Sequence, residues 1–427
     1  MRATAEQTDW AFHANDSAVF DALARGLHRE NLREYFGTPA YQELSELAAA
    51  AKKSAACGGP QVLIVPGMMG SRLCAIGGAE GRSGPSQTLW IDPLRIAEGR
   101  LKDLAMPPVK SIRPMGVLLF SYAKLKLRLD IEGFDTAFFP YDWRLGIDEL
   151  GAALAARIGA CRTSVVLIAH SMGGLIARMA MGQLPKRRVR KLIMLGTPNR
   201  GSFAPVQALR GTYPFVRKLS RLDRRHSPEH LAAKVFCTFP GLYHMLPAQR
   251  RAPVDLLDPR CWPPEGPTPD PALLGEVAAV RARLAAPDHR MIHIIGVNRE
   301  TVVAVRRTAV GFEYGSSANG DGTVPVAMAS LPKLKAYFID ESHGNLANNS
   351  KVIGAIIDLT RRGSTRALAR RFTPRRGRLA VTDDARLRLV PAGKIDWLRL
   401  DSAQREAALA DLDSGSLPAL PGVASMA

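Results

Sequence analysis

The sequence predicts an α/β fold with a mostly parallel central sheet and helices on both of its faces. Short apolar runs rich in β-branched residues recur along the chain, and none of them shows a polar face. Strands that are covered on both sides have this pattern. The runs are residues 61–65, 136–139, 165–169, 191–195, 291–295 and 336–339. Stretches with apolar residues at helical spacing lie between several of them, at 118–129, 148–158, 175–184 and 352–359. Alternation of strands and helices is typical of parallel sheets covered on both faces.

Further parts flank or interrupt this alternation. Residues 1–56 carry apolar side chains at helical spacing, which predicts an N-terminal helical extension. The core of the fold is expected to comprise residues 57–200 and 289–362. The interval 201–288 is too long for a crossover and contains Pro-rich stretches, so we expect an inserted cap or lid. Residues 363–427 are first Arg-rich and then rich in Ser, Pro and Ala, which predicts a basic, partly disordered tail.

The composition is that of an ordinary globular protein. With 46% hydrophobic and 23% charged residues, collagen-like, coiled-coil and wholly disordered classes are excluded. The 5 cysteines are scattered and lack C-x-x-C spacing, so neither a disulfide framework nor a zinc site is indicated, and we expect no metal or organic cofactor. The first residues do not read as a secretory signal, and no apolar run reaches the ~18 residues of a membrane span. We therefore expect a reduced, cytoplasmic protein.

The net charge of +19 favours contact with anionic surfaces. Basic residues cluster at 361–378 and at 185–191. No nucleic-acid-binding motif accompanies either cluster, so nucleic acid is disfavoured as a partner. An anionic membrane surface, touched peripherally, remains a candidate, and no protein partner is indicated. An Arg-rich composition that merely reflects coding bias explains the charge equally well.

The segment Ala169-His170-Ser171-Met172-Gly173 is the strongest chemical signal in the sequence. It follows a predicted strand and opens a predicted helix, which is the context of the G-x-S-x-G nucleophile elbow. This turn is tight, so small residues must flank the serine two positions away on either side. Gly173 satisfies one of these positions, and Ala169 replaces the usual glycine at the other. Ser171 is therefore the predicted nucleophile.

A serine hydroxyl needs a general base, and 9 histidines are available. His343 is favoured, because it follows the last predicted strand, where hydrolases of this kind place their base. His170 is adjacent to Ser171, and neighbouring side chains in such a turn diverge. His293 lies inside a predicted strand and is expected to pack in the core. The other histidines precede the sheet or lie in or beside the predicted cap: His13, His28, His226, His230, His244 and His289.

The acid that orients the base is expected between the serine and the histidine in the chain. Asp321 fits this order, and its flanking glycines allow a sharp loop after the strand predicted at 291–295, which leaves the carboxylate free. An ordinary Gly-Asp-Gly turn is the alternative. Asp340 and Asp142 are rival acids, although Asp340 is so close to His343 in sequence that a good imidazole contact is awkward.

Acyl chemistry also needs donors for the oxyanion. The backbone N–H of Met172, directly after the nucleophile, is one predicted donor, and the N–H of Met68, in the Gly-rich loop after the first strand, is the other. The same reasoning offers four substrate-binding candidates, namely Gly67, Met69, Trp143 and Arg144. A turn formed by Asp142 and Arg144, with Trp143 as packing, is the alternative for the last two.

Several of these pieces, taken in order, resemble the lecithin:cholesterol acyltransferase-like branch of the α/β-hydrolases. That branch includes phospholipid:diacylglycerol acyltransferases and lysosomal phospholipase A2. The most specific motifs are Tyr-Asp-Trp-Arg at 141–144 and Gly-Asp-Gly-Thr-Val-Pro at 320–325, and the others lie at 65–73, 89–93, 169–174 and 239–247, with His343. The resemblance covers roughly residues 61–360. It implies an α/β-hydrolase fold with a lid, Ser171, Asp321 and His343 as the triad, and Met68 and Met172 as the oxyanion donors.

The sequence thus predicts a serine-dependent acyl-ester hydrolase or O-acyltransferase. Its substrate would be a lipid ester, either a phospholipid or an acylglycerol, and the reaction would pass through an acyl-enzyme on Ser171. The acyl group would go to water or to an alcohol, and the sequence does not choose between them. A different class remains open: a membrane-surface or partner-binding protein that keeps an inactive hydrolase scaffold.

Overall fold

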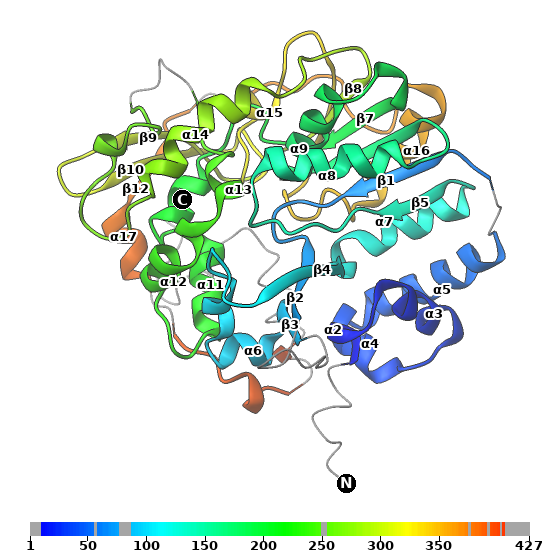
Figure 1. The fold of residues 1–427 in the computed structure, drawn as a ribbon, viewed down its shortest axis with the longest axis horizontal. Coiled ribbons are helices and arrows are strands. Elements are labelled where there is room, and N and C mark those ends of the chain that lie inside the picture. Colours follow the sequence, from blue (N-terminus) through cyan, green and yellow to red (C-terminus); the bar gives the residue numbers. More distant parts are fainter. Residues whose placement is uncertain are drawn as a thin grey trace.

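The computed structural model describes residues 10–54, 58–76, 87–248, 254–374, 377–390, 393–401 and 404–405. Its centre is a 6-stranded parallel sheet in the order β11-β8-β7-β6-β1-β5 (Figure 1). The strands are β1 (Gln61–Val65), β5 (Asp135–Phe138), β6 (Val165–His170), β7 (Val189–Leu195), β8 (Met291–Val297) and β11 (Lys335–Asp340). Each of them overlaps one of the apolar runs found in the sequence. The predicted α/β fold class with a mostly parallel sheet is confirmed.

Successive side chains of each strand enter two separate cores, one on each face of the sheet. In β1, Val62 and Ile64 belong to one buried cluster, whereas Leu63 and Val65 belong to the other. Two pairs of helices cover the faces: α8 (Ile147–Gly159) and α9 (Met172–Gly182) on one, and α7 (Leu119–Ile131) and α16 (Ser350–Arg362) on the other. The strands lack a polar face because neither face meets water.

The N-terminal helices pack directly on this core. They are α2 (Trp10–His13), α3 (Asp16–Arg25), α4 (Arg29–Phe36) and α5 (Thr38–Lys53). Their apolar side chains share the cluster that contains alternate residues of β1 and the inner side of α7. Asp16 also pairs with the buried Arg72 guanidinium, with 2.7 Å between Oδ1 and Nη2. In Figure 1 these helices lie next to α7, so residues 10–53 form an additional layer on one side of the sheet.

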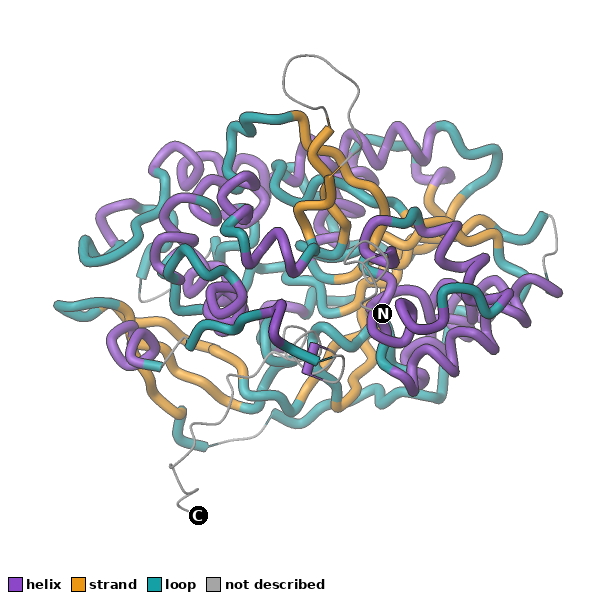
Figure 2. Tube along the Cα trace, turned by 90° about the horizontal axis from the view of Figure 1, so that it is seen from below, coloured by secondary structure: helices purple, strands orange, loops and turns teal. Residues whose placement is uncertain are grey.

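Two small antiparallel sheets were not expected from the sequence. One has the order β3-β2-β4, with β2 (Ser71–Ile76), β3 (Gln87–Trp90) and β4 (Ser111–Val117). The other has the order β12-β10-β9, with β9 (Thr301–Arg307), β10 (Phe312–Ser317) and β12 (Ala380–Asp383), and it lies apart from the central sheet on the left of Figure 2. Arg, Glu, Pro or Gly interrupts β2, β4 and β10, which hides these strands from a search for apolar runs, whereas the apolar run at 302–305 in β9 was a signal that the prediction missed. Residue 321 therefore follows β10 and not β8.

Short helices connect the central strands, and most of them belong to the predicted cap. Those in the predicted cap interval are α10 (Ala204–Leu209), α11 (Pro214–Leu222), α12 (Pro228–Lys234), α13 (Pro240–Tyr243) and α14 (Pro271–Ala282), with the 3-10 turns η4 (Phe236–Thr238) and η5 (Pro259–Cys261). The others are α6 (Pro93–Ala97), α15 (Val326–Ala329), η2 (Arg100–Leu104) and η3 (Lys186–Arg188). Within the described ranges, no helix has both the length and the apolar character needed to cross a bilayer.

A C-terminal segment ties the cap to the second small sheet. It contains β12, α17 (Asp384–Leu389) and η6 (Trp397–Arg399). Asp384 accepts hydrogen bonds from Arg210 Nε, directly after α10, at 3.0 Å, and from the Tyr314 hydroxyl on β10, at 2.6 Å. Lys394 Nζ donates to three carbonyl oxygens at the end of α11 and beyond, those of Ser220, Asp223 and His226. The Ser-, Pro- and Ala-rich end, for which a mobile tail was predicted, lies outside the described residues.

The ion pair between Arg210 and Asp384 yields a stability prediction, because both side chains are 0–1% exposed. Asp384→Asn keeps the volume but leaves the guanidinium buried without its counter-charge. We expect the free energy of unfolding, measured by urea titration, to fall by about 3–5 kcal/mol. Glu313→Gln is the matched control, since it breaks the exposed pair with Arg306 and should cost less than about 1 kcal/mol. Equal losses in the two variants would contradict the prediction.

Candidate active site

Ser171 occupies a strained turn between β6 and α9. Its φ of 53° and ψ of −126° lie outside the regions that residues with a side chain normally adopt. Its backbone N–H donates to Leu195 O on the neighbouring strand β7, at 2.8 Å, which fixes the turn against the sheet. The turn places the hydroxyl above the carboxyl edge of the parallel strands. The sequence motif predicted this strand–turn–helix geometry. The turn forms although Ala169, in β6, replaces the usual glycine of the motif.

Two glycines let the backbone close around this turn. A Cβ on Gly173 would lie 2.4 Å from the Pro66 carbonyl oxygen and 2.6 Å from that of Val65. A Cβ on Gly67 would lie 3.0 Å from Ser171 Cβ. The end of β1 and the start of α9 therefore touch at a distance that only glycine permits.

Ser171, His343 and Asp321 are joined by a chain of hydrogen bonds. His343 Nε2 lies 2.8 Å from Ser171 Oγ, and His343 Nδ1 lies 2.8 Å from Asp321 Oδ2. The carboxylate can only accept, so Nδ1 carries the proton and Nε2 offers its lone pair to the serine hydroxyl. The structure thus brings together the three side chains that the sequence selected from distant parts of the chain.

Backbone contacts hold Asp321 in place. Its Oδ1 accepts hydrogen bonds from the N–H groups of Thr323 at 3.0 Å and Val324 at 2.7 Å, and its side chain is 1% exposed. The Asp321 carbonyl also accepts from His343 N, at 2.8 Å. These contacts leave Oδ2 for the imidazole and fix the distance between the two loops.

Glu341 organises the loop that carries His343. Its Oε2 accepts hydrogen bonds from Asn349 Nδ2 at 2.7 Å and from Asn345 Nδ2 at 2.8 Å. Burial alone would raise the pKa of Glu341, but these donors and the Ser342 N–H lower it below its usual value. An ionised Glu341 therefore fastens both ends of the segment between β11 and α16.

The loop between β1 and β2 faces the serine. Gly67 N donates to the Tyr122 hydroxyl at 2.9 Å, and Met69 O accepts from Trp90 Nε1 at 2.7 Å, so the loop is anchored on both sides. Met68 lies between these anchors and lines the cavity described below. Met172 is the first residue of α9, and the first N–H groups of a helix have no partner within the helix.

A mainly apolar cavity of about 220 Å³ opens beside Ser171. The core contributes Met68 and Met69 from a loop and Leu118 and Phe120 from the start of α7. The cap contributes Ala208, Tyr213, Phe215, Val216, Phe236, Leu242 and Met245. By their sequence positions near the mouth, Met68, Met69, Met172 and Met245 are candidates for the wall of an acyl pocket. Met68, Met69 and Met245 line this cavity, and Met172 does not. The sequence gave no signal for the aromatic residues of the cap, because their positions depend on how the cap folds back over the sheet.

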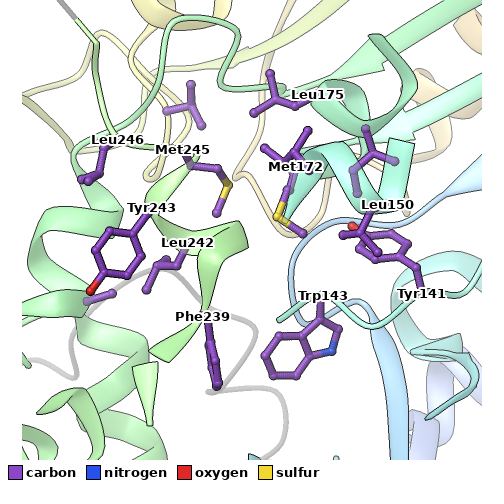
Figure 3. Close-up of a cluster of buried hydrophobic side chains, with 14 of the residues drawn as sticks. Tyr141, Trp143, Leu150, Met172, Leu175, Phe239, Leu242, Tyr243, Met245 and Leu246 are labelled. Carbon is purple, nitrogen blue, oxygen red and sulfur yellow. The ribbon is translucent and has the colours of Figure 1, made fainter. Parts of the chain in front are cut away.

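Trp143 and Arg144, which the sequence offered as substrate-binding residues, are not among the residues that line the cavity. Trp143 is fully buried, donates from Nε1 to Ser71 O at 3.0 Å and packs edge-on against Phe239 (Figure 3). Arg144 is bound by Asp142 through two contacts, of 2.9 Å from Nε to Oδ1 and 2.6 Å from Nη2 to Oδ2. The structure therefore agrees with the alternative, a supporting turn packed beside the site.

The rival residues have other partners. Asp142 is committed to Arg144, and Asp340 to Arg299, with 2.7 Å between Oδ1 and Nη1. His293 is a buried residue of β8, and burial lowers its pKa to about 4. His170 does not contact the Ser171 hydroxyl, but its ring lies 4.9 Å from that of His343. Within the described ranges, no group of three or more His, Cys, Asp or Glu side chains is placed to hold a metal ion.

Comparison with known proteins gives distant matches. Residues 154–236, which include Ser171, match a family model described as a PGAP1-like alpha/beta domain. The Bacillus licheniformis lipase BlEst2 in its propeptide form is 15% identical over 74% of this chain and 52% of that chain, with a TM-score of 0.37. The chain therefore spans about half the length of that lipase. No curated protein matches the chain.

Two further solved structures match the chain with similarly low sequence identity and TM-score. A chain of the Tle4–Tli4 complex is 12% identical over 70% of this chain and 97% of that chain, with a TM-score of 0.40. Phospholipase PlaB from Legionella pneumophila is 14% identical over 63% of this chain and 45% of that chain, with a TM-score of 0.29. The resemblance to the lecithin:cholesterol acyltransferase-like branch stays a prediction, since the matching family model is a different one.

Packing at the turn predicts unequal effects of two glycine substitutions. Gly173→Ala forces backbone atoms of β1 away from α9, so we expect the free energy of unfolding to fall by about 1–3 kcal/mol in urea titrations. Gly354→Ala in α16 is the control, because its Cβ would meet nothing within 4 Å. It should raise stability by about 0.5–1 kcal/mol. A stabilised Gly173→Ala variant would show that the contact at the turn is loose.

Proposed function

We propose that the protein cleaves carboxylic esters of lipids through an acyl-enzyme on Ser171. The observation that carries this proposal is the unbroken hydrogen-bond chain from Ser171 Oγ through His343 to Asp321, at the mouth of an apolar cavity. Such a chain lets a histidine take the serine proton while a carboxylate stabilises the resulting imidazolium. The apolar lining favours an acyl chain, because burying each CH₂ group stabilises the complex by about 0.8 kcal/mol.

In the first half of the reaction, Ser171 Oγ attacks the ester carbonyl carbon while His343 Nε2 accepts the hydroxyl proton. The carbonyl π electrons move onto oxygen and give a tetrahedral oxyanion. Asp321 accepts the hydrogen bond from Nδ1 throughout and holds the ring. When the C–O bond to the leaving alcohol breaks, His343 returns the proton to the alkoxide, and the acyl-enzyme remains.

The backbone N–H groups of Met68 and Met172 are the proposed oxyanion donors. They belong to the two segments that Gly67 and Gly173 bring into contact beside Ser171. Removing one donor from such a site typically costs about 2.7–4 kcal/mol of transition-state stabilisation. Gly67 acts here as a small residue that permits close approach, and Met69 contributes to the cavity wall.

The second half of the reaction repeats these steps with a different acceptor. An oxygen nucleophile gives its proton to His343, attacks the acyl carbon and displaces Ser171 Oγ, which recovers the proton. Water gives a fatty acid, and a lipid alcohol gives a new ester. Incubation with labelled phospholipid, with and without an alcohol acceptor, separates the two: free fatty acid alone means hydrolysis, and a new acyl ester means transfer.

Removal of the nucleophile tests the proposal directly. Ser171→Ala should lower turnover of a p-nitrophenyl acyl ester by about four or more orders of magnitude, because the acyl-enzyme cannot form. A fluorophosphonate probe should label the wild-type chain and not this variant. Ser202→Ala is the control, since Ser202 lines the same cavity but its hydroxyl donates to Thr323 O. Failure of the probe to label wild type would favour the inactive scaffold.

The cavity predicts a shift in chain-length preference. Ala208, on α10, is buried and lines the cavity, so Ala208→Phe should fill part of the space for the acyl chain. We expect kcat/KM for a dodecanoyl ester to fall about tenfold or more, while that for an acetyl ester stays near the wild-type value. Ala152→Phe on the exposed side of α8 is the matched control. Equal losses for both esters, with intact probe labelling, would place the acyl chain elsewhere.

A further inference from the structure

A second hydrogen-bond chain runs behind Ser171. It starts at the Gly67 N–H, passes through the Tyr122 hydroxyl to His170 Nδ1, and continues from His170 Nε2 to the His343 backbone carbonyl. Each of its three links measures 2.9 Å. The participants come from the loop after β1, from α7, from the end of β6 and from the loop after β11. The chain therefore connects four separate segments that lie around Ser171.

Every proton in this chain can be assigned. The His343 carbonyl can only accept, so His170 Nε2 carries a hydrogen. Burial, with a smaller contribution from nearby His343, lowers the pKa of His170 to about 3, so the ring is neutral and its Nδ1 accepts. The Tyr122 hydroxyl must then donate to Nδ1, and its oxygen accepts from Gly67 N. Each of the three hydrogen bonds therefore has one donor and one acceptor.

We propose that Tyr122 and His170 are positioning residues that set the distance between the oxyanion loop and the general base. The inference rests on the proposed function, because the two ends of the chain are Gly67, next to the proposed donor Met68, and His343 itself. If one link breaks, the hydrogen bonds no longer fix the distance between Gly67 and His343, although Ser171 stays in its turn.

The neutrality of His170 matters for the reaction. Its ring centroid lies 4.9 Å from that of His343, which becomes an imidazolium as the ester is attacked. A charged neighbour at that distance would oppose the proton transfer, whereas a neutral ring does not. A histidine at this position can donate to the His343 carbonyl and accept from Tyr122 at the same time. Leucine can do neither, and glutamine can do both.

The test compares three variants by kcat and KM on a p-nitrophenyl ester. Tyr122→Phe removes the central link, His170→Leu removes two links, and His170→Gln retains a donor and an acceptor. We expect the first two to lower kcat about 10- to 100-fold with KM nearly unchanged, because misplaced groups act on the transition state. His170→Gln should recover most of kcat. Titration with the fluorophosphonate probe corrects each value for the fraction of competent sites.

A transition-state analogue separates positioning from simple loss of structure. An alkyl trifluoromethyl ketone forms a tetrahedral oxyanion adduct with the serine, so its affinity for Tyr122→Phe should fall by the same factor as kcat/KM. Binding of a fatty acid, which makes no such adduct, should stay unchanged. Tyr337→Phe and His293→Leu are the matched controls, because both residues are buried in the sheet and neither lines the cavity. These controls should retain wild-type kcat per competent site.

Three outcomes overturn the inference. One is wild-type kcat in Tyr122→Phe, another is a loss in Tyr337→Phe equal to that in Tyr122→Phe, and the third is failure of glutamine to restore kcat lost with leucine. If the probe does not label wild-type Ser171, the proposed function fails first. If it labels Ser171 and the Tyr122 variant is fully active, only the positioning role fails.

Discussion

The strained backbone at Ser171 is the constraint on which the rest of the site depends. A residue with a side chain at φ 53° and ψ −126° is held there at a cost of about 1–3 kcal/mol, which the surrounding structure must offset. Two contacts with the sheet offset this cost. One is the hydrogen bond from Ser171 N to Leu195 O on β7, and the other is the packing of β1 against α9 at Gly67 and Gly173. Because the turn cannot relax, the hydroxyl has a fixed position relative to the strands. The loops of Asp321 and His343 are placed relative to that position.

The site divides its tasks between core and cap. Residues of the core carry the polar chemistry, and their hydrogen bonds lead back to strands and helix termini that are rigid. The cap contributes the apolar wall, in which Phe215, Phe236 and Met245 make few directional contacts. For the proposed reaction, a change in the cap should therefore alter which ester is accepted more than how the ester is cleaved. This separation is common in folds whose reactive groups lie on loops at the carboxyl edge of a sheet.

The sequence predicted the central sheet well, because strands buried on both faces are short, continuous apolar runs rich in β-branched residues. It also led to Ser171, Asp321 and His343, since the nucleophile turn and the order of serine, acid and base constrain where each must lie. Strands of the small sheets were missed because residues such as Arg72, Arg113 and Glu313 interrupt them. The contact between Tyr122 and His170 left no trace in the sequence, because it joins two elements through side chains that carry no motif.

The C-terminal segment completes the cap late in the chain. Arg210, directly after α10, and carbonyl groups at the end of α11 and beyond have their partners in Asp384 and Lys394, more than one hundred and fifty residues downstream. During synthesis on the ribosome, the strands that carry Ser171 and His343 emerge before these partners exist. A nascent chain can thus bring its reactive groups together before the cap has these C-terminal contacts, so the cap is complete only after residues 384 and 394 have been synthesised.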